Sequence, residues 1–323
     1  MQNPYLTRRP FILLPILAGL PLLKAQAQDG GVTRFIVTSG AGSATDAIAR
    51  FMANGLTKAW GVSTVVENKL GAGGVIGTEA VAKAPPDGKS ILFTYSAHYS
   101  NQWVMKTPYD AVQDFEPVAR LASSALMVSA GPNSRFQSVR DIITAARQKP
   151  GTITFGSAGM GTTSHMAGAL LATMAGIELV HVPYKAPGEV VVAVSSGLVD
   201  LAIGGLATYA PMVKAGRLKG IAVTTARRSA MLPEMPTLSE AGLPGYDISS
   251  YSFALAPRGT PATQIQRMSD VFTRLAATPE FKELCASVSN DVDIQDASTF
   301  KADAPKQLEH WRKLAGLTKE KAS

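Results

Sequence analysis

Residues 156–165 combine glycine, serine and threonine in a turn whose chemistry suits an anion. They follow a short β-like run at 152–155 and precede a helical pattern with apolar Ala167, Leu170, Leu171 and Met174. The first backbone N–H groups of a helix lack partners within the helix and carry a partial positive charge, which attracts anions. Hydroxyl side chains in such a turn either contact a ligand or cap the helix. The stretch alone allows both an anion site and a turn that binds nothing.

Two further strand–turn–helix units occur near the start of the chain. Residues 39–46 follow an apolar run at 35–38 and precede a helical pattern at 48–56, and the glycine-rich residues 71–77 follow a strand-like run at 64–67. This repeated order of strand, small-residue turn and helix predicts a doubly wound α/β sheet. Ligands of such sheets bind outside the carboxyl ends of the strands. We therefore expect these turns to form one site.

The rest of the chain continues the alternation. We expect strands at 91–95, 126–130, 180–184, 199–203, 220–224 and 252–256, and helices at 141–147, 190–196, 260–277 and around Phe300–Trp311. Thr237 and Glu240 fit a capping box, and Thr260 followed by Pro261 is typical of a helix start. A chain of 323 residues, 46% of them hydrophobic, is long enough for two domains.

The sequence lacks the motifs of several common enzyme classes. It has no G-x-S-x-G elbow, no H-E-x-x-H and no Walker-type G-K-[ST], and its four histidines and single cysteine lack metal-ligand spacing. We therefore expect no catalytic residue, no metal and no cofactor. A nucleotide-cofactor enzyme with a doubly wound fold stays open as an alternative, because Gly40 and Gly42 follow a strand and Glu67 could contact a ribose.

Residues 1–27 have the features of a cleaved export signal. Arg8 and Arg9 precede an apolar run at 11–23, and Ala25 and Ala27 form an A-x-A cleavage signal. The paired arginines fit either the general or the twin-arginine export route. Removing the three bases of this segment lowers the formal net charge from +7 to +4, with 28 basic against 24 acidic residues. Without a dense basic run carrying interleaved aromatics, nucleic acid is not an expected partner.

Taken in order, the turns resemble the periplasmic solute receptors of the tripartite tricarboxylate transporter family, also called Bug receptors. The matching pieces span nearly all of the chain after the export signal. They are residues 66–68 and 71–77, 84–88, 109–110 and 114–118, Gly156 and Ser157 with Gly161, Thr162 and His165, residues 181–185, 232–237 and 240–246.

The resemblance implies a two-lobed periplasmic-binding-protein fold of type II-like architecture, in which two doubly wound sheets are joined by two crossing segments. It places residues 28–126 and 251–323 in lobe 1 and residues 127–250 in lobe 2. It implies a monomeric periplasmic receptor without catalysis, which binds a small-molecule carboxylate and delivers it to the membrane components of a tripartite transporter. A receptor that acts mainly in signalling would share the same sequence features.

Family ligands are carboxylates, held by backbone N–H groups and hydroxyls of the turns after the strands of each lobe. On this sequence the expected ligand-binding residues of lobe 1 are Ser39, Gly42, Ser43, Thr45, Gly73, Gly74, Ser96 and His98. Those of lobe 2 are Ser157, Met160, Gly161, Thr162, Thr163 and Gly204.

Two departures from the family pattern bear on the ligand. The first turn, with Ser39 and Ser43, replaces a Pro-Pro-Gly-Gly-like sequence, and Gly204 stands where the family often has an Asp. An acid there would pair with the ammonium group of a ligand, whereas glycine removes the charge and makes room. We therefore expect a ligand without an amino group, such as an aromatic dicarboxylate like terephthalate or a longer aliphatic diacid. Four aromatic residues could form a ring-stacking wall: Tyr95, His98, Tyr99 and Trp103.

Overall fold

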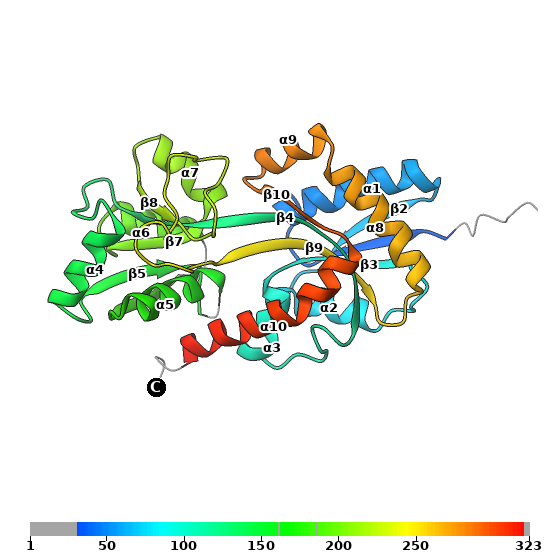
Figure 1. The fold of residues 1–323 in the computed structure, drawn as a ribbon, viewed down its shortest axis with the longest axis horizontal. Helices are drawn as coiled ribbons and strands as arrows, with labels where there is room; N and C mark the ends of the chain where they lie inside the picture. Colours follow the sequence, from blue (N-terminus) through cyan, green and yellow to red (C-terminus); the bar gives the residue numbers. More distant parts are fainter. Residues whose placement is uncertain (1–30, 161, 185–186, 320–323) are drawn as a thin grey trace, which may run out of the picture. The chain divides into compact units, whose positions relative to one another are not determined.

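The computed structural model describes residues 31–160, 162–184 and 187–319, so the export signal expected at 1–27 lies outside the described residues. Figure 1 shows the elements. The first strands, β1 (Thr33–Val37), β2 (Thr64–Asn68) and β3 (Ser90–Tyr95), pair in parallel, with β1 in the middle. Helices α1 (Ala44–Trp60), α2 (Val75–Ala82) and α3 (Ala97–Val104) follow these strands in turn, and the 3-10 turn η1 (Ala72–Gly74) precedes α2.

A long strand, β4 (Phe115–Ala130), extends through both halves of the sheet. Its first part pairs with β9 (Ser249–Pro257) and with β10 (Asp291–Gln295). Its second part pairs with β7 (Leu201–Gly205) and β8 (Lys219–Val223). We call β1, β2, β3, β9, β10 and the first part of β4 the first strand group. The strand predicted at 126–130 is therefore only the end of an element of 16 residues.

The second strand group consists of β5 (Ile153–Ser157), β6 (Leu179–Pro183), β7, β8 and the second part of β4. Here β5 pairs in parallel with β6 and with β7, and the strand order through both groups is β2-β1-β3-β9-β4-β7-β5-β6. Helices α4 (Val139–Gln148), α5 (Thr163–Ala175), α6 (Pro187–Ser195) and α7 (Leu206–Lys214) belong to this part of the chain. The prediction of an α/β sheet with two crossing segments is confirmed by this arrangement.

The C-terminal helices return to the first strand group. Helices α8 (Ala262–Ala276) and α9 (Pro279–Ser287) pack with α1 around a core that includes Phe35, Phe93 and Phe272. The last helix, α10 (Ala297–Lys319), packs against α3, β4 and α5, so it contacts elements associated with both strand groups (Figure 1). None of the helices within the described ranges combines the length and apolar character that crossing a bilayer requires.

Two predicted helix starts are wrong in detail. Thr237 and Glu240 exchange the reciprocal hydrogen bonds of a capping box, at 3.0 Å each, but these residues form a turn and no helix follows. The hydroxyl of Thr260 donates to the carbonyl of Pro257 at 2.7 Å, and α8 begins after Pro261. At Thr237 the hydrogen bonds expected from the sequence are formed, but in a turn, whereas the Thr260 hydroxyl bonds to an upstream carbonyl and does not cap α8.

A buried hydroxyl links two chain segments at the crossing between the two strand groups. Thr224 Oγ1 accepts a hydrogen bond from the backbone N–H of Leu126 at 3.0 Å and donates to the carbonyl of Ile248 at 2.7 Å. It therefore connects β4 to the segment that enters β9, at the point where the chain passes from one strand group to the other. Thr224 is fully buried, so no water can replace these bonds.

We predict that Thr224→Val lowers the free energy of unfolding by about 1–3 kcal/mol, because the buried N–H of Leu126 loses its side-chain acceptor. The matched control is Thr273→Val, since the Thr273 hydroxyl donates to the carbonyl of Ser269 within α8 and lies at a partly exposed position. Urea unfolding of both variants measures the difference. Equal stabilities would show that the Thr224 hydroxyl does not hold the crossing.

Candidate functional site

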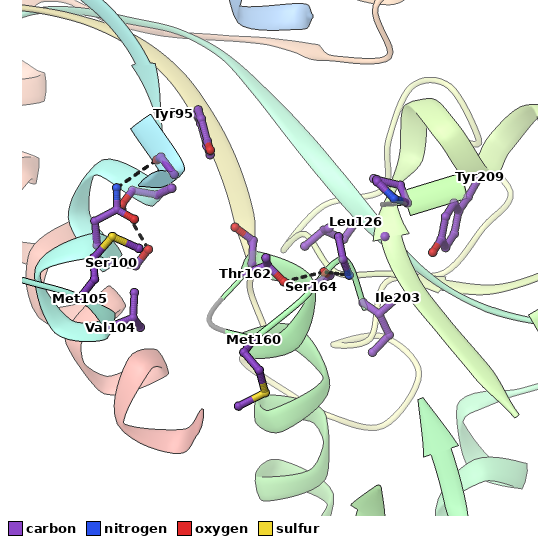
Figure 2. Close-up of a pocket in the computed structure, with 18 residues that line it drawn as sticks. Tyr95, Ser100, Val104, Met105, Leu126, Met160, Thr162, Ser164, Ile203 and Tyr209 are labelled. Carbon is purple, nitrogen blue, oxygen red and sulfur yellow. Dashed lines mark hydrogen bonds between the residues drawn. The ribbon is translucent and has the colours of Figure 1, made fainter. Parts of the chain in front are cut away.

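The starts of several helices open onto one cavity of about 410 Å³. Figure 2 shows Tyr95, Ser100 and Met105 on one side of it and Ile203 and Tyr209 on the other, with Thr162 and Ser164 between them. The lining comes from both strand groups and the helices that follow their strands. It comprises Gly73, Tyr95, Ala97, Ser100, Asn101, Val104, Met105, Leu126, Ala158, Met160, Thr162, Thr163, Ser164, Pro187, Ile203, Gly204, Gly205 and Tyr209.

Helix N-termini contribute part of this lining. Gly73 precedes α2, Ala97 begins α3, Thr163 begins α5, Pro187 begins α6 and Gly205 precedes α7. At α2, α3 and α7 no side chain caps the helix. The N-cap side chains at these three ends therefore leave the first N–H groups of the helices available, and the partial positive charges there favour a negatively charged partner.

The described lining residues include no aspartate, glutamate, lysine or arginine. The walls are mainly apolar and include Tyr95, Val104, Met105, Met160 and Ile203. An anion in this cavity would meet backbone dipoles and hydroxyls within an apolar surround, where each interaction is less screened than in bulk water.

The turn before α5 is held in shape by its own hydroxyls. Thr162 Oγ1 accepts from the backbone N–H of His165 at 3.4 Å, donates to the carbonyl of Gly159 at 2.7 Å and lies 3.0 Å from Ser164 Oγ. Ser164 Oγ in turn accepts from the backbone N–H of Ala158 at 3.2 Å. The hydroxyls therefore fix the backbone of the turn, and Thr162 is the N-cap of α5.

Two stacked histidines lie beneath this turn. The rings of His165 and His181 are parallel within 9° and their centroids are 3.8 Å apart, and His181 Nε2 is 2.6 Å from Ser157 Oγ. Burial lowers the pKa of both histidines from 6.5 to about 4, so both rings are neutral at pH 7. They support the turn by packing and hydrogen bonding and bring no positive charge to the cavity.

On the opposite side, Gly73 needs glycine for two reasons. Its φ is 63°, a left-handed conformation, and a Cβ would lie 3.3 Å from Asn101 Oδ1. Asn101 Nδ2 donates to the carbonyl of Gly73 at 3.1 Å, which ties the start of α2 to α3. The two helix starts are thus held as one unit at the edge of the cavity.

The structure brings together some of the predicted ligand-binding residues. Gly73, Met160, Thr162, Thr163 and Gly204 all line the cavity, although Gly73 follows β2, the next three follow β5, and Gly204 lies near the end of β7. Gly161 lies outside the described residues. These five residues, which are distant in the sequence, therefore lie together in the lining of one cavity.

The first turn is not part of the cavity lining. Ser39 Oγ and Ser43 Oγ bond to each other at 2.7 Å, Ser43 caps α1, and the N–H of Gly42 donates to Asp46 Oδ2 at 2.9 Å. Thr45 is buried, with its hydroxyl 3.3 Å from Ser252 Oγ. The polar groups of this turn are therefore engaged in holding α1 and β9.

Four further predicted residues also lie outside the lining. Ser157 contacts His181, Gly74 occupies the N-cap position of α2, and Ser96 is buried with its Oγ accepting the N–H of Tyr251 at 2.8 Å. His98 is buried, with Nε2 2.7 Å from the carbonyl of Ala111. Of the expected aromatic wall of Tyr95, His98, Tyr99 and Trp103, Tyr95 alone lines the cavity.

Sequence reasoning missed the residues contributed by α3 and α7. Ser100, Asn101, Val104 and Met105 line the cavity from α3 or its end, and Tyr209 does so from α7. The available signal was position: both helices begin directly after strands whose carboxyl ends reach the site. Neither helix has a clear apolar period, and Pro211 lies inside α7, so the sequence pattern did not reveal them.

Comparison with known proteins decides the family. The model described as "Tripartite tricarboxylate transporter family receptor" matches residues 48–316. The chain belongs to this receptor family. The receptor is similar to the UPF0065 protein of the tcbD–tcbE intergenic region in Pseudomonas sp. strain P51, with 34% identity over 314 residues that cover 93% of this chain and 92% of the relative.

Solved structures agree on the fold of the receptor. It is similar to the R. palustris protein Rpa4515 with adipate, with a TM-score of 0.75 and 30% identity, covering 88% of this chain and 96% of the other. It is also similar to the periplasmic binding protein BugD, with a TM-score of 0.71 and 28% identity. That match covers 88% of this chain and 98% of BugD. The predicted periplasmic-binding-protein fold is confirmed. Since the family is a receptor family and BugD is a periplasmic binding protein, the comparison favours binding over the nucleotide-cofactor enzyme.

The buried histidine of α3 gives a pH prediction. Burial lowers the pKa of His98 from 6.5 to about 4, so the folded chain binds a proton on this ring less readily than the unfolded chain. The contribution of neutral His98 to the free energy of unfolding is complete above pH 6.5. It is lost as the pH falls from 6.5 towards 4.

We predict that the wild-type receptor loses about 2 kcal/mol more stability between pH 7 and pH 5 than His98→Gln. Glutamine can still donate to the carbonyl of Ala111 but does not titrate in this range. Urea unfolding at the two pH values measures both losses. Equal losses in the two proteins would contradict a neutral, buried His98.

Proposed function

We propose that this receptor captures an organic carboxylate in the cavity between the starts of α2, α3, α5, α6 and α7 and delivers it to the membrane components of a tripartite transporter. The observation that carries the proposal is the set of helix N-termini facing one cavity whose described lining has no charged side chain. The partial charges of these ends suit carboxylate oxygens. The adipate named with the relative Rpa4515 supports the same ligand class.

The favoured ligand is a dicarboxylate without an amino group, either aromatic, such as terephthalate, or aliphatic and of similar length. Gly204 and Gly205 line the cavity where a carboxylate would be needed to pair with an ammonium group. Apolar walls from Val104, Met105 and Ile203 suit a ring or a methylene chain between two polar ends. An amino acid such as glutamate would bring an ammonium group to a site that offers it no charged partner among the described residues.

Binding by closure of two lobes follows from the family's architecture. In this proposal residues 28–126 and 251–323 form lobe 1, residues 127–250 form lobe 2, and the ligand brings the lobes together. Two features support it: β4 is shared by both strand groups, and the cavity lining includes Gly73 on one side and Gly204 on the other. The receptor acts in the periplasm as a monomer after removal of residues 1–27, and its docking onto a signalling protein is an alternative use of the same closed form.

Isothermal titration calorimetry with terephthalate, adipate and glutamate tests the ligand class. We predict a Kd of about 1 μM or below for a dicarboxylate, because a few charge-assisted hydrogen bonds contribute roughly 1.5–3 kcal/mol each before the costs of binding. Binding of glutamate should be at least about tenfold weaker, since its unpaired ammonium would be desolvated. A clear preference for glutamate would overturn the reading of Gly204.

A charge placed at the start of α5 tests the anion site itself. Thr163 is the first residue of α5 and lines the cavity. We predict that Thr163→Asp leaves the melting temperature unchanged or higher, because an acid suits the first turn of a helix. The same variant should weaken dicarboxylate binding by at least about tenfold, since two like charges about 5 Å apart repel by roughly 3 kcal/mol at an effective dielectric of 20.

The matched control is Thr163→Asn, which has nearly the same shape as the aspartate variant but no charge. It should bind within a few-fold of the wild type. If the aspartate and asparagine variants bind a dicarboxylate equally well, the ligand's charge does not lie at the start of α5.

A further inference from the structure

Tyr209 is a buried tyrosine of the cavity wall with an unused polar group. It lies on α7, one turn after the helix begins, and its side chain is fully buried while lining the cavity (Figure 2). Its hydroxyl is buried and has no hydrogen-bond partner among the described residues. A buried hydroxyl without a partner costs free energy, so its presence in the wall of a binding cavity points to a partner supplied by the ligand.

The neighbouring glycine makes room for this hydroxyl. A Cβ at Gly204 would lie 2.6 Å from the Tyr209 hydroxyl oxygen and 2.5 Å from the ring carbon that bears it. Any other residue at 204 would therefore displace the tyrosine. Glycine at 204 therefore does more than remove a charge. It also leaves space for the Tyr209 hydroxyl at the end of the cavity that the second strand group lines.

The N-terminus of α7, at the same end of the cavity as Tyr209, also suits an oxygen of the ligand. Helix α7 begins after Gly205, which lines the cavity, and no side chain caps this helix. Burial raises the pKa of Tyr209, so the phenol stays protonated and can donate a hydrogen bond. A neutral donor and the positive end of a helix together favour a carboxylate over an ammonium group.

We propose that the Tyr209 hydroxyl donates a hydrogen bond to the second carboxylate of the ligand, so that this receptor selects dicarboxylates over monocarboxylates of the same length. The inference rests on the proposed function, because it assigns one end of the same cavity. The first carboxylate then lies near the starts of α2 and α3, where Gly73 and Ala97 line the cavity. The apolar walls between the two ends contact the part of the ligand that joins the carboxylates.

The test is calorimetric titration of the purified receptor and of Tyr209→Phe with two ligand pairs, adipate with hexanoate and terephthalate with benzoate. In hexanoate a methyl group replaces the second carboxylate of adipate, and in benzoate a hydrogen replaces the second carboxylate of terephthalate. We consider the pair whose diacid binds the wild type more tightly. In that pair we expect the Kd of the diacid to be at least tenfold lower than the Kd of its matched monoacid. Tyr209→Phe should weaken diacid binding about tenfold and leave monoacid binding within twofold.

Control measurements separate this effect from damage to the fold. Tyr209→Phe removes a hydroxyl that has no hydrogen-bond partner in the described part of the chain, so the melting temperature of the variant without ligand should equal or exceed that of the wild type. Gly204→Ala should weaken diacid binding as Tyr209→Phe does, because it displaces the tyrosine, whereas Gly316→Ala, where a Cβ meets no atom within 4 Å, should have no effect.

The outcomes separate the inference from the function on which it rests. If the wild type binds diacids and Tyr209→Phe binds them equally well, the assignment of Tyr209 is overturned and the carboxylate receptor stands. Equal binding of the diacid and its matched monoacid by the wild type also overturns it. If the wild type binds none of the four acids, the proposed function fails, and the inference fails with it.

Discussion

The positive ends of helix dipoles, directed into a cavity with apolar walls, are the interaction on which the proposed site depends. Backbone N–H groups at the starts of α2, α3 and α7 have no side-chain cap, and these starts meet at one cavity. A site of this kind attracts a carboxylate without a fixed cation, because each helix contributes about half a positive charge. Such donors are part of the backbone, so their positions are set by the fold itself.

The fold brings these helix starts together through the strands that both groups share. Parallel strands followed by helices place every helix start at the carboxyl edge of its strand group. The pairing of β4 with β9 in one group and with β7 and β8 in the other brings two such edges to one cavity. The buried hydroxyl of Thr224 and the packing of α10 against α3 and α5 then join the two parts of the chain beside the cavity.

Part of the cavity lining was predictable from small residues near the ends of strands. Gly73 and Thr162 lie in turns that follow β2 and β5, Thr163 begins the next helix, and Gly204 lies near the end of β7, so a doubly wound sheet places them at the ligand edge. The sequence could not show how each hydroxyl is used. Ser43 looks like Thr162 in its local sequence, yet the turn that it belongs to lies outside the lining.

Other features depend on contacts distant in the sequence. β4 begins well before its apolar run because residues such as Ala119 and Ala122 pair with β9, and Arg120 is held by Asp293 and Asp303. No local pattern records such pairing. The sequence also could not indicate the ligand contact that we propose for Tyr209. That proposal depends on the space beside Gly204 and on the lack of a hydrogen-bond partner for the Tyr209 hydroxyl among the described residues.

The most direct test of the central claim is a crystal structure of the receptor with a bound dicarboxylate such as adipate. The account predicts carboxylate oxygens within about 2.7–3.1 Å of backbone nitrogens at the starts of α2, α3, α5 or α7, with no lysine or arginine side chain in contact. A diacid held mainly by cationic side chains, or bound outside this cavity, would contradict it.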